Sequence, residues 1–119
     1  MRNFRSLKVW QKSHELSVSV YKITTLFPRE ETYGLTSQLR RAVLSVPANI
    51  AEGCGCNGHR EFARSLEIAV RSASETEYYL LLSRDLKYLN PTTYEQVNNQ
   101  VTEAKRMLAR LIQRLAADS

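Results

Sequence analysis

The sequence predicts an all-α protein, an antiparallel up-down-up-down four-helix bundle with a kinked second helix. Apolar residues recur at alternating spacings of three and four in four segments, which is the period of one helical face. Glycine and proline number only four and three, which suits long helices better than short strands joined by turns. The connections are short and force neighbouring helices to run antiparallel, so we expect residues 1–119 to form one domain.

The first two predicted helices each carry one apolar stripe. In the first helix the stripe is Val9, Ser13, Leu16, Val20, Ile23 and Phe27. Pro28 ends this helix, because the residue before a proline is pushed out of helical conformation. The second helix begins near Glu30, and Gly53 and Gly55 give its C-terminus flexibility. Its stripe is Leu35, Leu39, Ala42, Val46, Asn49 and Gly53, with Val43 and Ile50 alongside.

Pro47 lies inside the second predicted helix, near its end. It removes a backbone donor and leaves the carbonyl of Val43 without a helical partner, at a cost of about 3 kcal/mol in an ordinary helix interior. Because residues 48–53 are too few to form a helix alone, we expect one continuous, kinked helix. Asn49 either hydrogen-bonds the freed or neighbouring backbone and stabilises the kink, or it contacts a ligand.

The third predicted helix begins near His59 and is broken at Asn90-Pro91. Its inward row is Phe62, Leu66, Ala69, Ala73, Thr76, Leu80 and Ser83. The fourth helix opens either with Asn90 as its cap and Pro91 at the first helical position, or with a capping box over residues 92–95. Its seam follows a heptad alternation and consists of Tyr94, Val97, Val101, Ala104, Leu108, Leu111 and Leu115.

Two runs of residues carry a family resemblance, YGLTSQLRRA at 33–42 and SVPANIAEG at 45–53. Further matches are Leu7, Val9, Trp10, Glu61, Phe62, Ser72, Glu75 and Glu77. Up to about Leu89 the chain resembles the bacterial four-helix bundle family that includes proteins encoded in intervening sequences of 23S rRNA genes. Three residues depart from the pattern of this family: Arg71, where the family tends to have glycine, and Cys54 and Cys56.

The resemblance implies a small cytosolic bundle that assembles into a ring-shaped homopentamer. It also implies a relationship to the accessory proteins of diversity-generating retroelements, which bind nucleic acid and a reverse transcriptase. For most members of the family the molecular function is unknown, and the resemblance supplies no catalytic residues.

One end of the predicted bundle is rich in cations. Lysine and arginine outnumber aspartate and glutamate by 17 to 12, and this balance favours acidic partners. The candidate nucleic-acid-binding residues, at this end or along the fourth helix, are Arg2, Arg5, Lys8, Lys12, Arg60, Arg64, Arg106, Arg110 and Arg114. These residues either hold phosphates, with release of condensed counterions, or form ordinary solvated faces that keep the protein soluble.

A second apolar surface predicts self-association. The third helix is apolar on more than one face, whereas a monomeric bundle needs only one apolar face per helix. The candidate interface residues are Trp10, Tyr21, Tyr78, Tyr79, Leu81 and Leu82. The alternative is that Tyr78 and Leu81 cover the sides of the core within one chain.

The segment 54–59 holds two thiols and an imidazole, from Cys54, Cys56 and His59. A closed zinc site needs four ligands, and the other histidine, His14, lies two turns into the first helix. We therefore expect free thiols in a solvent-exposed loop, and we expect no metal or other cofactor. A metal site and a redox sensor are the alternatives.

Two glutamates of the third helix, Glu75 and Glu77, face different directions and lack the Glu-x-x-His pattern of di-iron bundles. Glu75 could instead pair with Arg40 or Arg41. No nucleophile beside a base, no phosphate-binding glycine loop and no pair of general acids is evident, so we expect no enzyme activity.

The chain begins without an apolar signal-peptide region, and its longest apolar run, at 78–82, is too short to span a bilayer. We expect a cytoplasmic protein without a membrane partner. The predicted function is a non-enzymatic homo-oligomer that binds the backbone of RNA or DNA through its basic end. The alternative is an adaptor ring that binds another protein and no nucleic acid.

Overall fold

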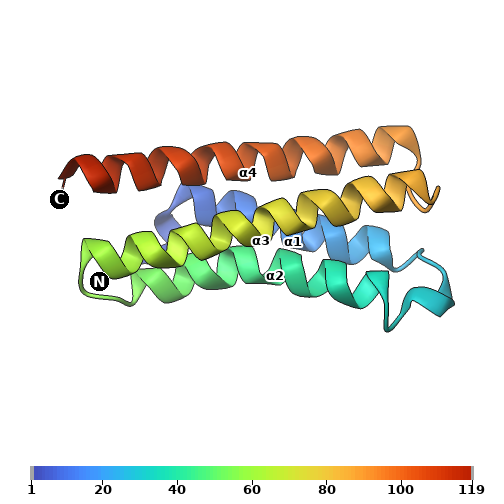
Figure 1. The fold of residues 1–119 in the computed structure, drawn as a ribbon, viewed down its shortest axis with the longest axis horizontal. Helices are drawn as coiled ribbons and strands as arrows, with labels where there is room; N and C mark the ends of the chain where they lie inside the picture. The colour runs from blue at the N-terminus through green and yellow to red at the C-terminus, as the bar shows by residue number, and fades with distance from the viewer. Residues whose placement is uncertain (1, 119) are drawn as a thin grey trace.

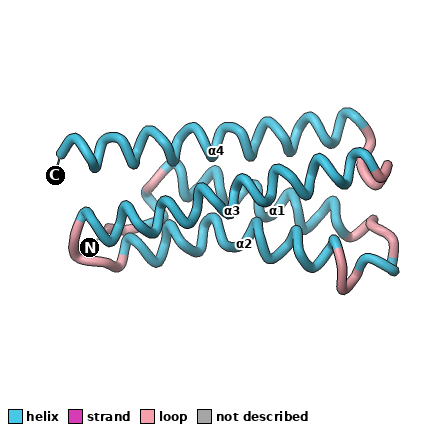
Figure 2. The backbone as a smooth tube through the Cα atoms, in the orientation of Figure 1, coloured by secondary structure: helices cyan, strands magenta, loops and turns pink. Residues whose placement is uncertain are grey.

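The computed structural model describes residues 2–118 and contains four long helices. These are α1 (Lys8–Thr24), α2 (Leu35–Cys54), α3 (His59–Asp85) and α4 (Pro91–Asp118). Two short 3₁₀ turns, η1 (Phe4–Ser6) and η2 (Arg29–Glu31), precede α1 and α2. The helices run alternately up and down in a bundle 46 × 23 × 20 Å in extent (Figures 1 and 2), which confirms the predicted four-helix architecture.

Each helix packs against two neighbours. α1 contacts α2 and α4, and α3 contacts the same two helices, so α1 and α3 occupy opposite corners of the bundle. Both termini and the α2–α3 connection lie at one end, and the other two connections lie at the opposite end (Figure 1). This arrangement brings the start of α1 and the end of α4 to the end where the sequence concentrates its cations.

The core consists largely of the predicted stripes. Its largest fully buried side chains are Phe62, Leu16, Leu39, Ile50, Leu66, Leu80, Leu108, Val20, Val43, Val46, Val101 and Thr76. Ile23, Tyr94 and Leu111 are half-buried and pack against the margin of this core. Each buried aliphatic side chain contributes about 1.5–3 kcal/mol relative to exposure, so this shared interior holds the bundle together.

The second helix begins at Leu35, and the prediction of a start near Glu30 is wrong. η2 precedes the helix, and Gly34 interrupts helical geometry with φ −110° and ψ −114°. Glu31 stabilises the later start, because its Oε1 atom accepts a hydrogen bond from the backbone N–H of Leu35 at 3.1 Å. A carboxylate at this position also interacts favourably with the positive end of the helix dipole.

Tyr88 links the α3–α4 connection to the α1–α2 connection at the end opposite the termini. Its hydroxyl donates a hydrogen bond to Glu31 Oε2 at 3.0 Å, and its ring lies 5.4 Å from that of Phe27. Phe27 is buried as predicted, but it lies in the turn after α1, which ends at Thr24. The hydrogen bond to Glu31, with partial burial, raises the pKa of Tyr88 and keeps the phenol a donor.

The fourth helix opens by the first of the two predicted routes. Asn90 Oδ1 accepts a hydrogen bond from the backbone N–H of Thr93 at 2.8 Å, and Pro91 is the first helical residue. A proline loses nothing at this position, because the first N–H groups of a helix have no partner within it.

α2 continues through Pro47 without a break, as predicted, while the size of the kink stays a prediction. The Ser17 hydroxyl on α1 is a donor shared between the freed carbonyl of Val43 at 3.2 Å and the carbonyl of Ser13 in its own helix at 3.1 Å. Asn49 is half-buried at the edge of the stripe, and its Nδ2 donates to the carbonyl and hydroxyl oxygens of Ser45 at 2.7 and 2.9 Å. The prediction that Asn49 binds neighbouring backbone is confirmed, but Ser17 satisfies the freed carbonyl.

Candidate functional site

A hollow of about 200 Å³ opens at the basic end between the start of α1 and the last turns of α4. Its lining residues are Leu7, Lys8, Val9, Met107, Arg110, Leu111 and Arg114. The helical period produces this mixture, because Met107 and Leu111 are one turn apart on one row of α4 and Arg110 and Arg114 on the adjacent row. The result is an apolar floor with cations beside it.

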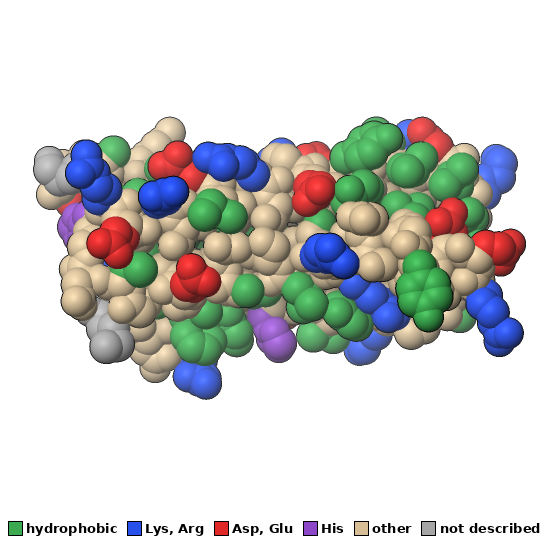
Figure 3. All heavy atoms as spheres, turned by 60° about the horizontal axis from the view of Figure 1, so that its bottom comes forward, with side chains coloured by type: hydrophobic (Ala, Val, Ile, Leu, Met, Phe, Trp, Pro, Cys, Tyr) green, Lys and Arg blue, Asp and Glu red, His purple; other side chains and the backbone are tan. Residues whose placement is uncertain are grey.

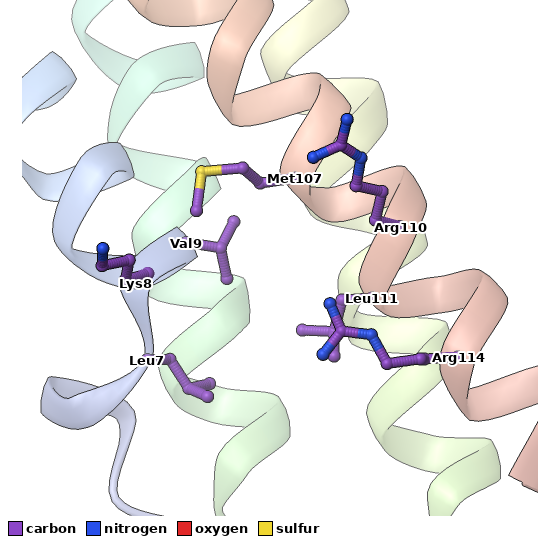
Figure 4. A pocket seen from close by; sticks show the side chains of 7 residues that line it. All are labelled: Leu7, Lys8, Val9, Met107, Arg110, Leu111 and Arg114. Atoms are coloured by element: carbon purple, nitrogen blue, oxygen red, sulfur yellow. The ribbon is translucent and has the colours of Figure 1, made fainter.

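The two arginines of the hollow lie along its α4 side. Figure 4 shows Arg114 reaching from α4 toward the first segment and the guanidinium of Arg110 lying along α4 near Met107, with Leu111 and Met107 between the two segments. In the same view the ammonium group of Lys8 points away from α4, so its alkyl chain lines the hollow. An arginine guanidinium is planar and binds phosphate through two parallel hydrogen bonds, and it also stacks on aromatic rings.

These cations have no acidic partner within residues 2–118. The ion pairs of the structure are Lys12–Glu103 at 3.6 Å, Arg84–Asp85 at 3.0 Å and Lys105–Glu77 at 2.8 Å. None of them uses Lys8, Arg110 or Arg114, so these three charges are free to meet an external anion. Arg110 and Arg114 are also one turn apart, where like charges repel by about 0.2–0.5 kcal/mol.

Three of the other predicted cations at this end are already engaged. The guanidinium of Arg2 lies 4.2 Å from the ring centre of Phe62, and its backbone N–H donates to the carbonyl of Cys54 at 2.9 Å. The guanidinium of Arg5 lies 4.5 Å from the ring centre of Phe4. Lys12 has Glu103 as its partner, although this exposed pair contributes little to stability.

The remaining predicted cations lie away from the hollow. Arg60 and Arg64 are exposed on α3, at the opposite corner of the bundle from α1. Arg106 is exposed on α4 and lines a separate depression together with Glu103. On the face shown in Figure 3, lysines and arginines are interspersed with acidic residues along the whole length of the bundle. The structure therefore places three cations that have no ion pair in residues 2–118, Lys8, Arg110 and Arg114, around one hollow on the α1–α4 side, while other such cations lie elsewhere on the surface.

The predicted interface residues of α1 border a second, apolar hollow of about 290 Å³. It is lined by His14, Ser17, Val18, Tyr21, Lys22, Leu44 and Pro47. Tyr21 remains 37% exposed although the guanidinium of Arg40 lies 4.6 Å from its ring centre. Trp10 is half-buried in an aromatic row beside this hollow, 4.8 Å from the ring of Phe4 and 5.0 Å from that of His14.

The predicted interface residues of α3 form a separate patch. Tyr78 is 56% exposed, whereas Tyr79, Leu81 and Leu82 are half-buried. The hydroxyl of Tyr79 donates a hydrogen bond to Glu75 at 3.2 Å. Because α1 and α3 occupy opposite corners, the structure separates the predicted interface into two surfaces.

The ion pair predicted for Glu75 with Arg40 or Arg41 is absent within residues 2–118. Arg40 instead donates hydrogen bonds to Thr24 Oγ1 at 2.8 Å and to the carbonyl oxygen of Tyr21 at 3.3 Å. The pair that does link α3 to α4 is Glu77–Lys105, which sequence reasoning missed.

Both cysteines are free, but the prediction of exposed loop thiols is wrong for Cys54. Cys54 is the last residue of α2 and is buried, because it follows Ile50 by one helical turn on the core face. Burial raises the pKa of its thiol, and the guanidinium of Arg2 opposes this effect only in part. Partial burial of Cys56, and then the Glu61 carboxylate, also raise the pKa of that thiol.

Raised thiol pKa values disfavour the thiolate that a redox sensor or a metal ligand needs. Across residues 2–118, no three His, Cys, Asp or Glu side chains come together in an arrangement that could hold a metal ion. The same part of the chain contains no helix long and apolar enough to cross a membrane.

Comparison with known proteins decides the family. Residues 5–110 match the family described as 23S rRNA-intervening sequence protein. The chain belongs to this family. It is also similar to a crystal structure of a protein of unknown function from the S23 ribosomal protein family of Bacteroides thetaiotaomicron VPI-5482. That similarity has a TM-score of 0.81 and 31% sequence identity, over 88% of this chain and 95% of the other. No curated protein matches the chain.

Membership of the 23S rRNA-intervening sequence family agrees with the predicted resemblance and with the four-helix fold. The runs 33–42 and 45–53, which carry the resemblance, both lie within the matched region. They form the end of the turn before α2 and most of α2 itself, including the helix segment around Pro47.

Proposed function

We propose that this protein is a non-enzymatic, homo-oligomeric bundle that binds the phosphate backbone of RNA or DNA through the cations of the α1–α4 hollow. The observation that carries the proposal is the placement of Arg110 and Arg114 beside one hollow, with Lys8 at its edge, and none of the three has an acidic partner in residues 2–118. Each phosphate held there would relieve repulsion between the arginines and release condensed counterions.

The expected mode of binding is sequence-independent. The cations lie on α4 and at the start of α1, and α4 packs against α1 and α3 as part of the bundle instead of standing free as a recognition helix. Contacts to phosphates fix the position of a protein on nucleic acid without reading its sequence. We therefore expect similar affinity for RNA and DNA strands of different sequence at the same salt concentration.

The test is a charge reversal at the hollow with a matched reversal elsewhere. Arg110→Glu with Arg114→Glu should lower the affinity for generic RNA and DNA by about tenfold or more at low salt, because two phosphate contacts become repulsive. Arg29→Glu with Lys87→Glu makes the same change in net charge with exposed residues at the opposite end, outside both apolar patches. Equal losses in the two double variants would contradict a localised interface.

Two separated apolar patches support a ring over a two-fold dimer. A two-fold dimer buries the same patch on both subunits and would leave the second patch of each exposed. A ring buries the α1 patch of one protomer against the α3 patch of the next, so that both are covered. The family resemblance implies five protomers, whereas the patches alone support only a closed ring.

The oligomer is tested by sedimentation. The wild-type protein at micromolar concentration should sediment well above the 13.7 kDa of one chain. Tyr78→Asp with Leu81→Lys should dissociate the ring while circular dichroism still reports full helicity. A wild-type monomer would contradict the assembly.

The second candidate function is an adaptor ring that binds another protein. The hollow beside Tyr21 and the patch around Tyr78 favour it, because exposed apolar surfaces commonly mark protein interfaces. The two functions differ at low ionic strength: absence of detectable binding to generic RNA and DNA near about 50 mM salt would support the adaptor.

A further inference from the structure

We propose that the α1–α4 hollow seats one unpaired base of a single-stranded nucleic acid, with Arg110 and Arg114 on the adjoining phosphates. This inference rests on the proposed nucleic-acid function and adds the strand type and the part of the nucleotide that is bound. It starts from a feature that phosphate binding does not need, namely the apolar floor formed by Leu7, Val9, Met107 and Leu111.

The chemistry of the floor selects against other parts of a nucleic acid. Phosphates and sugars are polar and gain nothing from contact with aliphatic side chains, whereas the face of a base is largely apolar and polarisable. In a duplex both faces of each base are covered by stacking, so only an unpaired base can lie on the floor. Met107 suits this role because a thioether side chain adapts its shape and makes favourable contacts with aromatic rings.

The size of the hollow fits one base. Pockets for drug-sized ligands have volumes of about 300–1,000 Å³, and this hollow measures about 200 Å³. Arg110 and Arg114 are one turn apart, with about 5–6 Å between their Cβ atoms, so both can serve the phosphates beside one nucleotide. Their guanidinium groups can also pack against the base seated between the two segments.

The test compares three nucleic acids of equal length on the full-length protein at one low salt concentration. They are a single strand of mixed sequence, the same strand with every base removed, and a duplex. We expect the base-bearing strand to bind about fivefold more tightly than the abasic strand, the low end for base stacking because the floor is aliphatic. The affinity of the duplex, compared at the same number of phosphates, should not exceed that of the abasic strand.

A matched pair of variants assigns the gain to the hollow. Met107→Gln keeps the side-chain length and every cation, and it should remove most of the preference for the base-bearing strand without changing the affinity for the abasic strand. Leu86→Gln makes a similar change at an exposed leucine of the opposite end and should leave the preference intact. Thermal melting of both variants verifies that they fold.

The outcomes separate this inference from the proposed function. Equal binding of the base-bearing, abasic and duplex nucleic acids leaves the proposed function standing and overturns the inference. No binding of any of them removes both. A third outcome uses an acidic peptide of alternating leucine and glutamate as the probe. If this peptide binds more tightly than the single strand and loses affinity in Met107→Gln, the hollow is a protein-binding site, and the inference is overturned.

Discussion

The Oγ atom of Ser17 on α1 lies 3.2 Å from the carbonyl oxygen of Val43 on α2, which is the acceptor that Pro47 deprives of its helical donor. The helix interruption and its compensation therefore come from different helices. This hydrogen bond couples the backbone irregularity of α2 directly to the α1–α2 contact.

The coupling between these residues can be measured. Ser17→Ala leaves the buried carbonyl of Val43 without a donor and should lower the free energy of unfolding by about 1–3 kcal/mol. In a Pro47→Ala background the residue at 47 regains its N–H, so Ser17→Ala should cost about 1 kcal/mol less. Urea unfolding of the four proteins gives both numbers, and an identical cost in both backgrounds would show that Ser17 does not compensate for the proline.

Gly53 is predicted to tolerate no side chain. A Cβ atom there would lie 2.8 Å from the Cβ of Ser65 and 2.9 Å from the Cδ1 of Phe62, so α2 and α3 would have to separate. Gly53→Ala should therefore destabilise the protein by about 1–3 kcal/mol, despite the better helix propensity of alanine. Gly58→Ala is the control, because a Cβ at that position meets nothing within 4 Å. Equal stability of the two variants would refute the close-contact argument.

Cys56 is predicted to be a slow thiol. Its pKa lies above the ordinary value of 9.0 because of partial burial and the nearby Glu61 carboxylate, so its thiolate fraction near pH 8 is smaller than that of a free cysteine. Alkylation by iodoacetamide, followed at this residue by mass spectrometry, should be slower than that of a cysteine peptide and should accelerate as the pH rises. Glu61→Gln should increase the rate at pH 8. Faster alkylation than the peptide would revive the redox-sensor alternative.

Much of the fold could be predicted from the sequence because burial follows the helical period. Leu16, Leu39, Leu66 and Leu108 each lie on a predicted stripe and are fully buried. The start of α2 was mispredicted because a cap depends on the geometry of one side chain, that of Glu31, which no periodic pattern encodes. Helix ends are decided by such local hydrogen bonds.

The candidate site could be predicted only in part. The sequence placed Arg106, Arg110 and Arg114 among the candidate cations of the fourth helix, but it could not show that Met107 and Leu111 would meet Leu7 and Val9 beside the last two. That meeting depends on the packing of two helices far apart in the chain. Arg60 and Arg64 were assigned to the same end by topology, which does not distinguish the corners of a bundle. The role of Ser17 was missed for the same reason, since its partner is on another helix.

The most direct test of the central claim is the salt dependence of binding to generic RNA and DNA. On the α1–α4 side of this end, Arg5, Lys8, Arg110 and Arg114 are exposed and have no ion pair in residues 2–118, which corresponds to about four phosphates per protomer. A plot of log K against log salt concentration should then have a slope of about −3 to −4, reduced by about 2 in the Arg110→Glu, Arg114→Glu variant. Affinity that does not change between about 50 and 200 mM salt, or no binding at the lower concentration, would contradict a phosphate-binding site at this end of the bundle.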